Sequence, residues 1–250
     1  MRRLALVLAA ACGLMATVSA TAGGQSSSAP LTSGDAAALA VRGRTLFAEG
    51  CASCHGTDLR GLRGRGPSLI GAGAAAADFY LSTGRMPLDN PTDQPDRAEP
   101  AYARGDIAAL VAYVGSFGGP GVPRIDVRAG DVGRGRTAFA ERCAGCHQIV
   151  ARGGIVTGGA VPALDKSTAT QLAEAVRIGP YLMPKFGAAQ LDARRLADLA
   201  AYVDYTRHPD DRGGWAIGHL GPIPEGMVAW LLAGLVLLAV ARVIGERAPR

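Results

Sequence analysis

The pentapeptide Cys-x-x-Cys-His occurs twice in this chain, and this repetition constrains the fold more than any other feature. The two copies occupy residues 51–55 and 143–147 and use four of the five cysteines. Two thiols at this spacing reach the same porphyrin edge and add to its vinyl groups, and the following histidine binds the iron. The motifs predict two covalently attached haem c groups. Thioether bonds are expected at Cys51, Cys54, Cys143 and Cys146, and axial imidazoles at His55 and His147.

Zinc sites and redox-active dithiols also use two cysteines separated by two residues. A zinc site needs further ligands at similar spacing, and a redox dithiol needs no histidine behind its second thiol. The sequence supplies no such further ligands, so haem attachment is favoured for both motifs. The fifth cysteine, Cys12, lies in the apolar N-terminal stretch, which leaves no pair for a disulfide.

The sequence around the two motifs repeats as well. Residues 43–49 read GRTLFAE and residues 135–141 read GRTAFAE. Further matches follow in the same order, with residues 66–69, 85–87 and 107–114 corresponding to residues 161–164, 182–184 and 196–203. Four matched blocks in one order indicate a duplicated domain, and two copies are too few for a solenoid.

Met86 and Met183 are the candidates for the sixth iron ligand of each half. They follow their histidines by 31 and 36 residues, and each directly precedes a proline. A methionine is ordinarily a filler of hydrophobic cores. Random packing, however, would not place the two methionines outside the apolar termini at matched positions. A thioether opposite a histidine raises the reduction potential of haem iron, which suits an electron carrier.

The chain before and between the motifs divides into recognisable segments. A basic start, an apolar run and the small residues Ala20-Thr21-Ala22 predict a signal peptide, with an uncleaved N-terminal anchor as the alternative. Helical periodicity predicts a helix from Asp35 to the first motif and a closing helix over residues 105–117 that crosses it. The second half repeats this scheme, with a closing helix from Asp192. The predicted segments are a signal peptide at 1–22, a flexible tether at 23–34, a first domain at 35–117, a linker at 118–130 and a second domain at 131–208.

A C-terminal segment is predicted to cross a membrane. After a Gly/Pro-rich juxtamembrane stretch at 209–221, the span covers residues 222–244, and residues 227–241 carry no charge. A buried amphipathic helix is excluded because this run has no polar face. Three arginines in residues 242–250 favour a cytoplasmic C-terminus, with tail 245–250, and place both haem domains on the extracytoplasmic side of the cell membrane.

The charge of the chain excludes nucleic acid as a partner class. The formal net charge is +5, of which residues 1–22 carry two and residues 242–250 another two. Residues 23–241 are left with +1. Binding to nucleic acid needs clustered positive charge, and no such cluster remains.

Taken with its C-terminal anchor, the duplicated haem pattern resembles the dihaem cytochrome c subunit of the menaquinol:cytochrome c reductase of actinobacteria. The similarity extends from about Arg42 to the end, and the sequence GPIPEG at 221–226 is its most family-specific part. The resemblance implies an all-α fold of two tandem class I cytochrome c domains followed by one transmembrane helix. It also implies that the carbonyl of Pro67, twelve residues after His55, accepts the other imidazole N–H.

The same resemblance implies the function and the partners. The chain would assemble with cytochrome b and a Rieske iron–sulfur subunit and would pass electrons to a haem a/copper cytochrome c oxidase. It would thus be part of a quinol–cytochrome-c reductase, while the chain alone is an electron carrier. The alternatives are a free-standing anchored dihaem shuttle and a dihaem enzyme such as a peroxidase. Such enzymes usually keep one iron open, and the matched methionines argue against that class.

Overall fold

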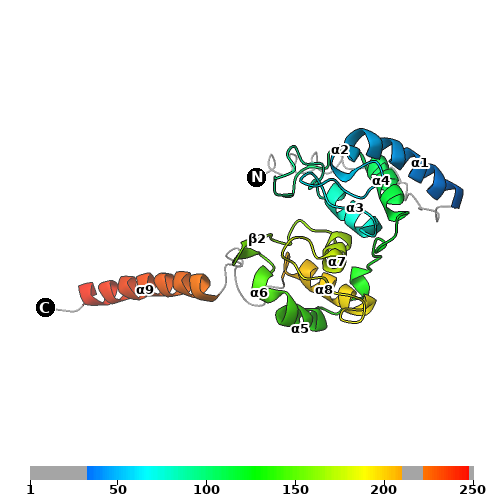
Figure 1. The fold of residues 1–250 in the computed structure, drawn as a ribbon. Helices are drawn as coiled ribbons and strands as arrows, with labels where there is room; N and C mark the ends of the chain where they lie inside the picture. Colours follow the sequence, from blue (N-terminus) through cyan, green and yellow to red (C-terminus); the bar gives the residue numbers. More distant parts are fainter. Residues whose placement is uncertain (1–32, 210–221, 248–250) are drawn as a thin grey trace, which may run out of the picture.

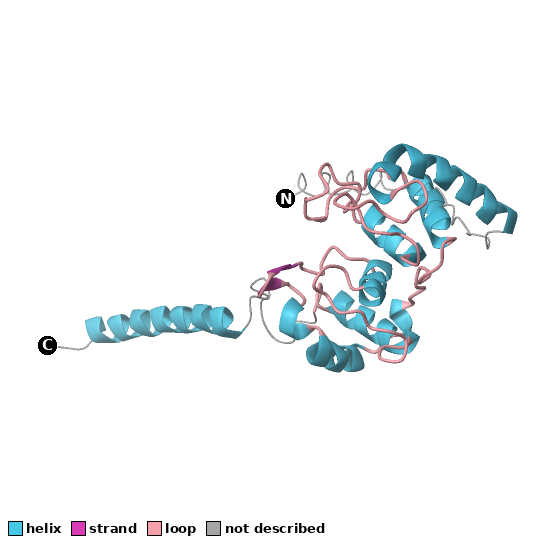
Figure 2. Ribbon diagram, in the orientation of Figure 1, coloured by secondary structure: helices cyan, strands magenta, loops and turns pink. Residues whose placement is uncertain are grey.

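The computed structural model describes residues 33–209 and 222–247, and Figures 1 and 2 show a helical protein with two units and a separate C-terminal helix. The predicted signal peptide, residues 23–32 of the tether, residues 210–221 and residues 248–250 lie outside the described residues. The first unit contains α1 (Ser33–Gly50), α2 (Ala52–His55), α3 (Gly73–Ser82) and α4 (Arg104–Gly115). The second contains η1 (Val127–Ala129), α5 (Val132–Arg142), α6 (Ala144–His147), β1 (Gly154–Val156), β2 (Gly159–Val161), α7 (Ala169–Ile178) and α8 (Ala193–Tyr205), and α9 (Pro222–Arg247) follows.

In each unit the first long helix crosses the last, and a glycine lies at the crossing point. A Cβ built on Gly43 would lie 2.0 Å from the Ala109 carbonyl oxygen, and one on Gly135 would lie 2.0 Å from that of Asp198. Any larger residue would therefore push α1 away from α4, or α5 away from α8. The repeated glycine of the two GRT blocks is explained by this close backbone approach.

One turn after each glycine, a phenylalanine fills the core of its unit. The rings of Phe47 and Tyr113 lie 5.5 Å apart, and those of Phe139 and Tyr202 lie 5.3 Å apart, both pairs tilted. Both phenylalanines are buried. Tilted aromatic pairs at this separation stabilise a core beyond the area that they bury. The two halves therefore share one packing scheme as well as one motif.

Side-chain caps fix the helix starts of the second unit. Asp131 and Asp192 accept hydrogen bonds from the backbone of Arg134 and Arg195 at the starts of α5 and α8. Thr168 and Gln171 form a reciprocal capping box at α7. In the first unit α1 is described from Ser33, two residues before its predicted start at Asp35, and Asp35 lies in its first turn. An acidic side chain there still interacts favourably with the helix dipole.

The helical framework agrees with the prediction, but the second unit also contains a two-stranded antiparallel sheet, drawn in magenta in Figure 2. Its register pairs Gly154 with Val161 and Ile155 with Ala160. The turn between the strands contains Gly158 with φ of 96°, a value that favours glycine. This hairpin lies between His147 and Pro162, which are three residues farther apart than His55 and Pro67. The prediction of an all-α fold is therefore corrected at this insertion.

α9 stands apart from both units in Figure 1. Its stretch Glu225–Glu246 has a mean hydropathy of 2.4 over the most apolar window, and none of that window is buried. Near its end, the Arg242 guanidinium lies 3.0 Å from Glu246. Within the described residues, α9 is the one helix that is long and apolar enough to cross a membrane.

Candidate haem sites

The two Cys-x-x-Cys-His motifs adopt nearly the same backbone conformation. Cys51 (φ −120°, ψ −30°) and Cys143 (φ −121°, ψ −35°) each precede a single helical turn. The backbone N–H of His55 donates to the Cys51 carbonyl at 2.9 Å, and that of His147 donates to Cys143 at 2.8 Å. One turn brings the second thiol to the same side as the first, as attachment to one porphyrin edge requires.

Each motif histidine is held through one ring nitrogen by the carbonyl of a proline. Nδ1 of His55 lies 2.8 Å from the Pro67 oxygen, and Nδ1 of His147 lies 3.2 Å from the Pro162 oxygen. The bond implied for Pro67 is thus confirmed. With Nδ1 donating to a carbonyl, Nε2 carries the free lone pair, which is the arrangement of a histidine that ligates a metal.

Gly66 lets the loop of the first unit approach its motif closely. A Cβ at this position would lie 2.9 Å from the Cys54 carbonyl oxygen and 3.2 Å from Cε1 of the His55 ring. A side chain there would push the loop outward and lengthen the bond from His55 to Pro67. The glycine therefore contributes to the orientation of the imidazole.

The electrostatics of the motifs argue against redox-active dithiols. Burial raises the pKa of the Cys51 thiol to about 11, and the neighbouring Cys54 adds to the shift. Burial also raises the pKa of Cys143 to about 11, against the opposing effect of Arg142. Catalytic dithiols have lowered pKa values, because the thiolate is the reactive form. These thiols are therefore suited to a structural, covalent role.

The imidazole of His147 is held in the form that binds metals. Its burial lowers its pKa, and the hydrogen bond to Pro162 only partly opposes this effect. A lowered pKa keeps the ring neutral at physiological pH, as iron ligation requires.

The structure places each candidate methionine against the same core as the first cysteine of its motif. Met86 and Cys51 both pack on the cluster that contains Phe47. Met183 and Cys143 both pack on the cluster that contains Phe139. The assignment of Met86 and Met183 as axial ligands stays a prediction.

The segments that carry the methionines are fixed by hydrogen bonds to or from their backbone. In the first unit, the N–H groups of Arg85 and Met86 both donate to the Tyr80 carbonyl, at 2.9 and 3.1 Å. In the second, the Arg177 guanidinium donates to the carbonyls of Phe186 and Leu191, at 2.8 and 2.6 Å. Arg177 was not predicted from the sequence, because a lone arginine on an amphipathic helix gives no signal of this role.

The donor set fits haem c better than a metal ion bound by the protein alone. Within residues 33–209 and 222–247, no three His, Cys, Asp or Glu side chains gather closely enough to hold a metal ion. A zinc site would need such a group. Paired thiols with one carbonyl-bound histidine supply one ligand atom and two attachment points, which matches the needs of a covalent haem.

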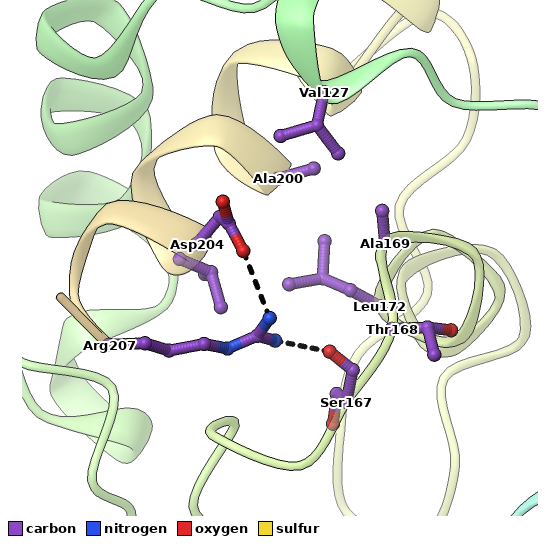
Figure 3. Close-up of a pocket in the computed structure, with 9 residues that line it drawn as sticks. Val127, Ser167, Thr168, Ala169, Leu172, Ala200, Asp204 and Arg207 are labelled. Carbon is purple, nitrogen blue, oxygen red and sulfur yellow. Dashed lines mark hydrogen bonds and ion pairs between the residues drawn. The ribbon is translucent and has the colours of Figure 1, made fainter. Parts of the chain in front are cut away.

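A small pocket beside the core of the second unit does not belong to either motif (Figure 3). It is lined by η1, α7 and α8, and Arg207 projects across it. The guanidinium lies 3.0 Å from Asp204 and also donates to the Ser167 carbonyl. This arginine braces the end of α8 against the loop before α7, so we assign the pocket a structural role.

These features define a cytochrome of the c type. The family described as "Cytochrome c" matches residues 40–117, and the family described as "Cytochrome C oxidase, cbb3-type, subunit III" matches residues 130–203. The chain thus has two cytochrome c-type domains, and domains of this kind imply haem c as the cofactor.

Curated relatives identify the family more narrowly. The "Cytochrome bc1 complex cytochrome c subunit" of Corynebacterium diphtheriae is 36% identical over 232 residues, covering 85% of this chain and 83% of the relative. The protein of the same name from Mycobacterium tuberculosis H37Rv is 38% identical over 220 residues, covering 84% and 79%. The "Cbb3-type cytochrome c oxidase subunit CcoP" of Azospirillum sp. B510 is 31% identical over 186 residues, covering 64% and 60%. The chain belongs to the family of cytochrome bc1 complex cytochrome c subunits.

Proposed function

We propose that this chain is the electron-relay subunit of a quinol:cytochrome c reductase. It would take electrons from the Rieske iron–sulfur subunit and deliver them to a haem a/copper cytochrome c oxidase in the respiratory chain. The observation that carries the proposal is the duplicated motif with a carbonyl-anchored histidine, in a chain that belongs to the bc1-complex family. Haem c, when bound, supplies a one-electron redox couple at each site.

Within this proposal, eight side chains hold two haem groups in two tandem class I domains, at residues 35–117 and 131–208. The buried thiols anchor the porphyrins, and the proline carbonyls orient the imidazoles. The hydrogen bonds around Tyr80 and Arg177 fix the segments of the two methionines. The attachment residues are Cys51, Cys54, Cys143 and Cys146, and the axial ligands are His55, Met86, His147 and Met183.

We infer that α9 anchors the chain in the cell membrane, with both domains outside and the C-terminus in the cytoplasm. Its length, its apolar composition and the arginines after it support this orientation. The oxidation of quinol would then belong to the whole complex, together with cytochrome b, and this polypeptide would transfer electrons only.

Detergent extraction followed by affinity purification and mass analysis tests this function. Co-purification of the full chain with a cytochrome b and a Rieske protein is expected. A shortened chain that ends at residue 221, and so lacks α9, is the control. This shortened chain is expected to be absent from the membrane fraction. Recovery of the intact chain alone would favour the free-standing shuttle. Rapid carbon monoxide binding to the reduced protein would favour a dihaem enzyme with an open iron.

A further inference from the structure

The two units meet where α3 packs against α7, and the kind of contact differs between the two ends of this helix pair. Ala75 and Phe79 of α3 form a buried apolar cluster with Ile178 of α7. At the other end of the contact, the Gln171 side-chain amide donates to the Ser82 hydroxyl at 3.2 Å. The helices therefore run antiparallel, with polar contacts at one end and apolar contacts at the other.

Glu174 lies between these two ends, completely buried, with 0% of its surface exposed. It follows Gln171 by three residues and precedes Ile178 by four, so it lies on the helix face turned toward α3. No N–H or hydroxyl donor among the described residues reaches either carboxyl oxygen, so the polar partner left to Glu174 is another carboxyl group. The facing carboxyl on α3 is Asp78, which lies four residues before Ser82 and is half-buried.

Within residues 33–209 and 222–247, no cation contributes to the pKa of Glu174. Arg97 reaches the same interface but donates to Gln171 at 2.8 Å. Arg85 lies over the Phe79 ring, 5.0 Å from its centroid. Arg177, the next basic residue on α7, is bound to two backbone carbonyls. Tyr80, a further titratable residue on α3, is half-buried, and its phenol cannot supply a positive charge.

α8, the other helix packed on α7, supplies no charge to Glu174 either. Its acidic residues Asp198 and Asp204 pair with Arg134 and Arg207. Arg195 donates to the Gln190 carbonyl at 2.9 Å, and the acidic Asp198 stands beside Arg194. The residues that α8 contributes to the shared core are apolar, among them Leu196 and Leu199.

A buried carboxylate without a donor or a counter-ion is strongly unfavourable, whereas a neutral carboxylic acid that donates one hydrogen bond costs far less to bury. Burial, together with the hydrogen bond and the charge of Asp78, raises the pKa of Glu174 to about 9. Glu174 therefore carries a proton at neutral pH while the helices are packed, and that proton can be donated only toward Asp78.

We propose that Glu174 donates its proton in a hydrogen bond to the Asp78 carboxyl group across the boundary between the two units, and that this bond is a latch that holds α3 against α7. The pKa of Glu174 is higher in the packed state than in the separated state, where its ordinary value is 4.5. The stabilisation is therefore complete below the ordinary value and is lost as the pH rises through about 9. Above that pH two facing carboxylates repel each other, and the contact opens.

The latch depends only on this interface, and its consequence for electron relay rests on the proposed function. If the units carry haems, acidification at the outer membrane surface favours the packed arrangement of the two sites. A failure of the bc-complex assignment would leave the latch intact. The infrared absorption of the carboxyl group and hydrogen exchange at the helix contact therefore test the latch without a measurement of electron transfer.

Infrared titration of the purified full chain in detergent tests whether Glu174 carries the proton. A carboxylic acid absorbs separately from a carboxylate, and we expect an acid band that disappears with a midpoint near pH 9. Glu174→Gln should remove this band. Asp89→Asn, at an exposed loop position, is the matched control and should keep it. The absence of the band in the parent at pH 7, or its persistence in Glu174→Gln, would overturn the proposal.

Hydrogen exchange tests the contact itself, with the amides of α3 and α7 normalised to those of α1 to remove the intrinsic effect of pH. The normalised rate in the parent should rise about a hundredfold from pH 7 to pH 10, because opening becomes about tenfold more favourable for each pH unit below the midpoint near 9 and levels off above it. Glu174→Gln should stay constant within about twofold, since a neutral amide cannot ionise. An equal rise in both proteins would refute the latch.

Asp78→Asn is the second variant if Glu174→Gln does not fold. Removal of the facing charge should move the midpoint of the acid band to lower pH, because the repulsion that disfavours ionised Glu174 is gone. An unchanged midpoint would show that Asp78 has no part in the latch. Loss of the acid band at pH 7 on addition of calcium alone would mean that the pair is a cation site, which would also overturn the proposal.

Discussion

Replacement of Gly135 by alanine is the sharpest test of the packing scheme. Gly135 lies where α5 crosses α8, and the new Cβ would lie 2.0 Å from the Asp198 carbonyl oxygen and 2.8 Å from the Cβ of Tyr202. Ordinary contact begins at 3.4 Å. The obstacle is backbone, which has no rotamer with which to avoid the methyl group. The helices must therefore separate by more than about 1 Å in a core that packs as densely as a crystal.

The cost has two opposing parts. Forced overpacking of a core destabilises a protein by about 1–3 kcal/mol, and a clash with backbone belongs at the upper end of that range. Alanine in place of glycine returns up to ~1 kcal/mol through helix propensity. Separation of the helices would also strain the bond from Arg134 to Asp198 at 2.9 Å. We expect a net loss of about 2 kcal/mol in the free energy of unfolding of the second domain.

Thermal unfolding of the full chain, followed by circular dichroism, measures this loss. A domain of this size should lose on the order of 10 °C in Tm for about 2 kcal/mol. Gly133→Ala is the matched control on the same helix, because its Cβ would meet only Asp131 at 3.4 Å, an ordinary contact. The control should be as stable as the parent or, through helix propensity, up to about 5 °C more stable. A Gly135→Ala protein as stable as the control would refute the account of the crossing.

Four further substitutions test the sites and their surroundings. Met86→Leu and Met183→Leu should each leave both haems attached but lower one reduction potential by on the order of 0.1 V, within the ~0.8 V that axial ligands span. A potentiometric titration measures both midpoints, and two unchanged midpoints would contradict the ligand assignment. Cys146→Ser should reduce covalent haem in the second domain, visible in the intact mass of the chain, and full attachment would count against the motif. The hydrogen bond from Arg134 lowers the pKa of Asp198, so the stabilisation by Asp198 is present above its ordinary 3.8 and is lost as the pH falls through the lower folded value. Asp198→Asn should therefore lower the free energy of unfolding at neutral pH and flatten its decline in acid, and an unchanged acid profile would argue against the pair.

The haem motifs and the duplication could be predicted because their information is local. Two thiols and a histidine within five residues define their chemistry wherever the chain goes, and the structure gives both copies the same turn. The crossing of the closing helix over the first helix is also confirmed, with α4 packed on α1 and α8 on α5. The bond from His55 to Pro67 followed from the family resemblance and is present at 2.8 Å.

The remaining features depend on contacts between residues that are distant in sequence. The β1–β2 hairpin arises from β-branched residues between glycines, a short pattern that loops also contain. Glu174 lies on a regular amphipathic helix, where an acidic residue is ordinarily solvated, and only the packing of α3 buries it. Gln171 was equally unremarkable in the sequence, although it completes a capping box and bonds to Ser82. Such roles become visible only when the two units are in place.

The central claim is that this chain carries two covalent haems, each anchored by one of its motifs. The most direct measurement combines the intact mass of the purified full chain with the optical spectrum of its reduced pyridine complex. The account predicts a mass increase of two haem groups and a spectrum of the c type at two equivalents per polypeptide. One equivalent or none, or haem that organic solvent extracts from the protein, would contradict it.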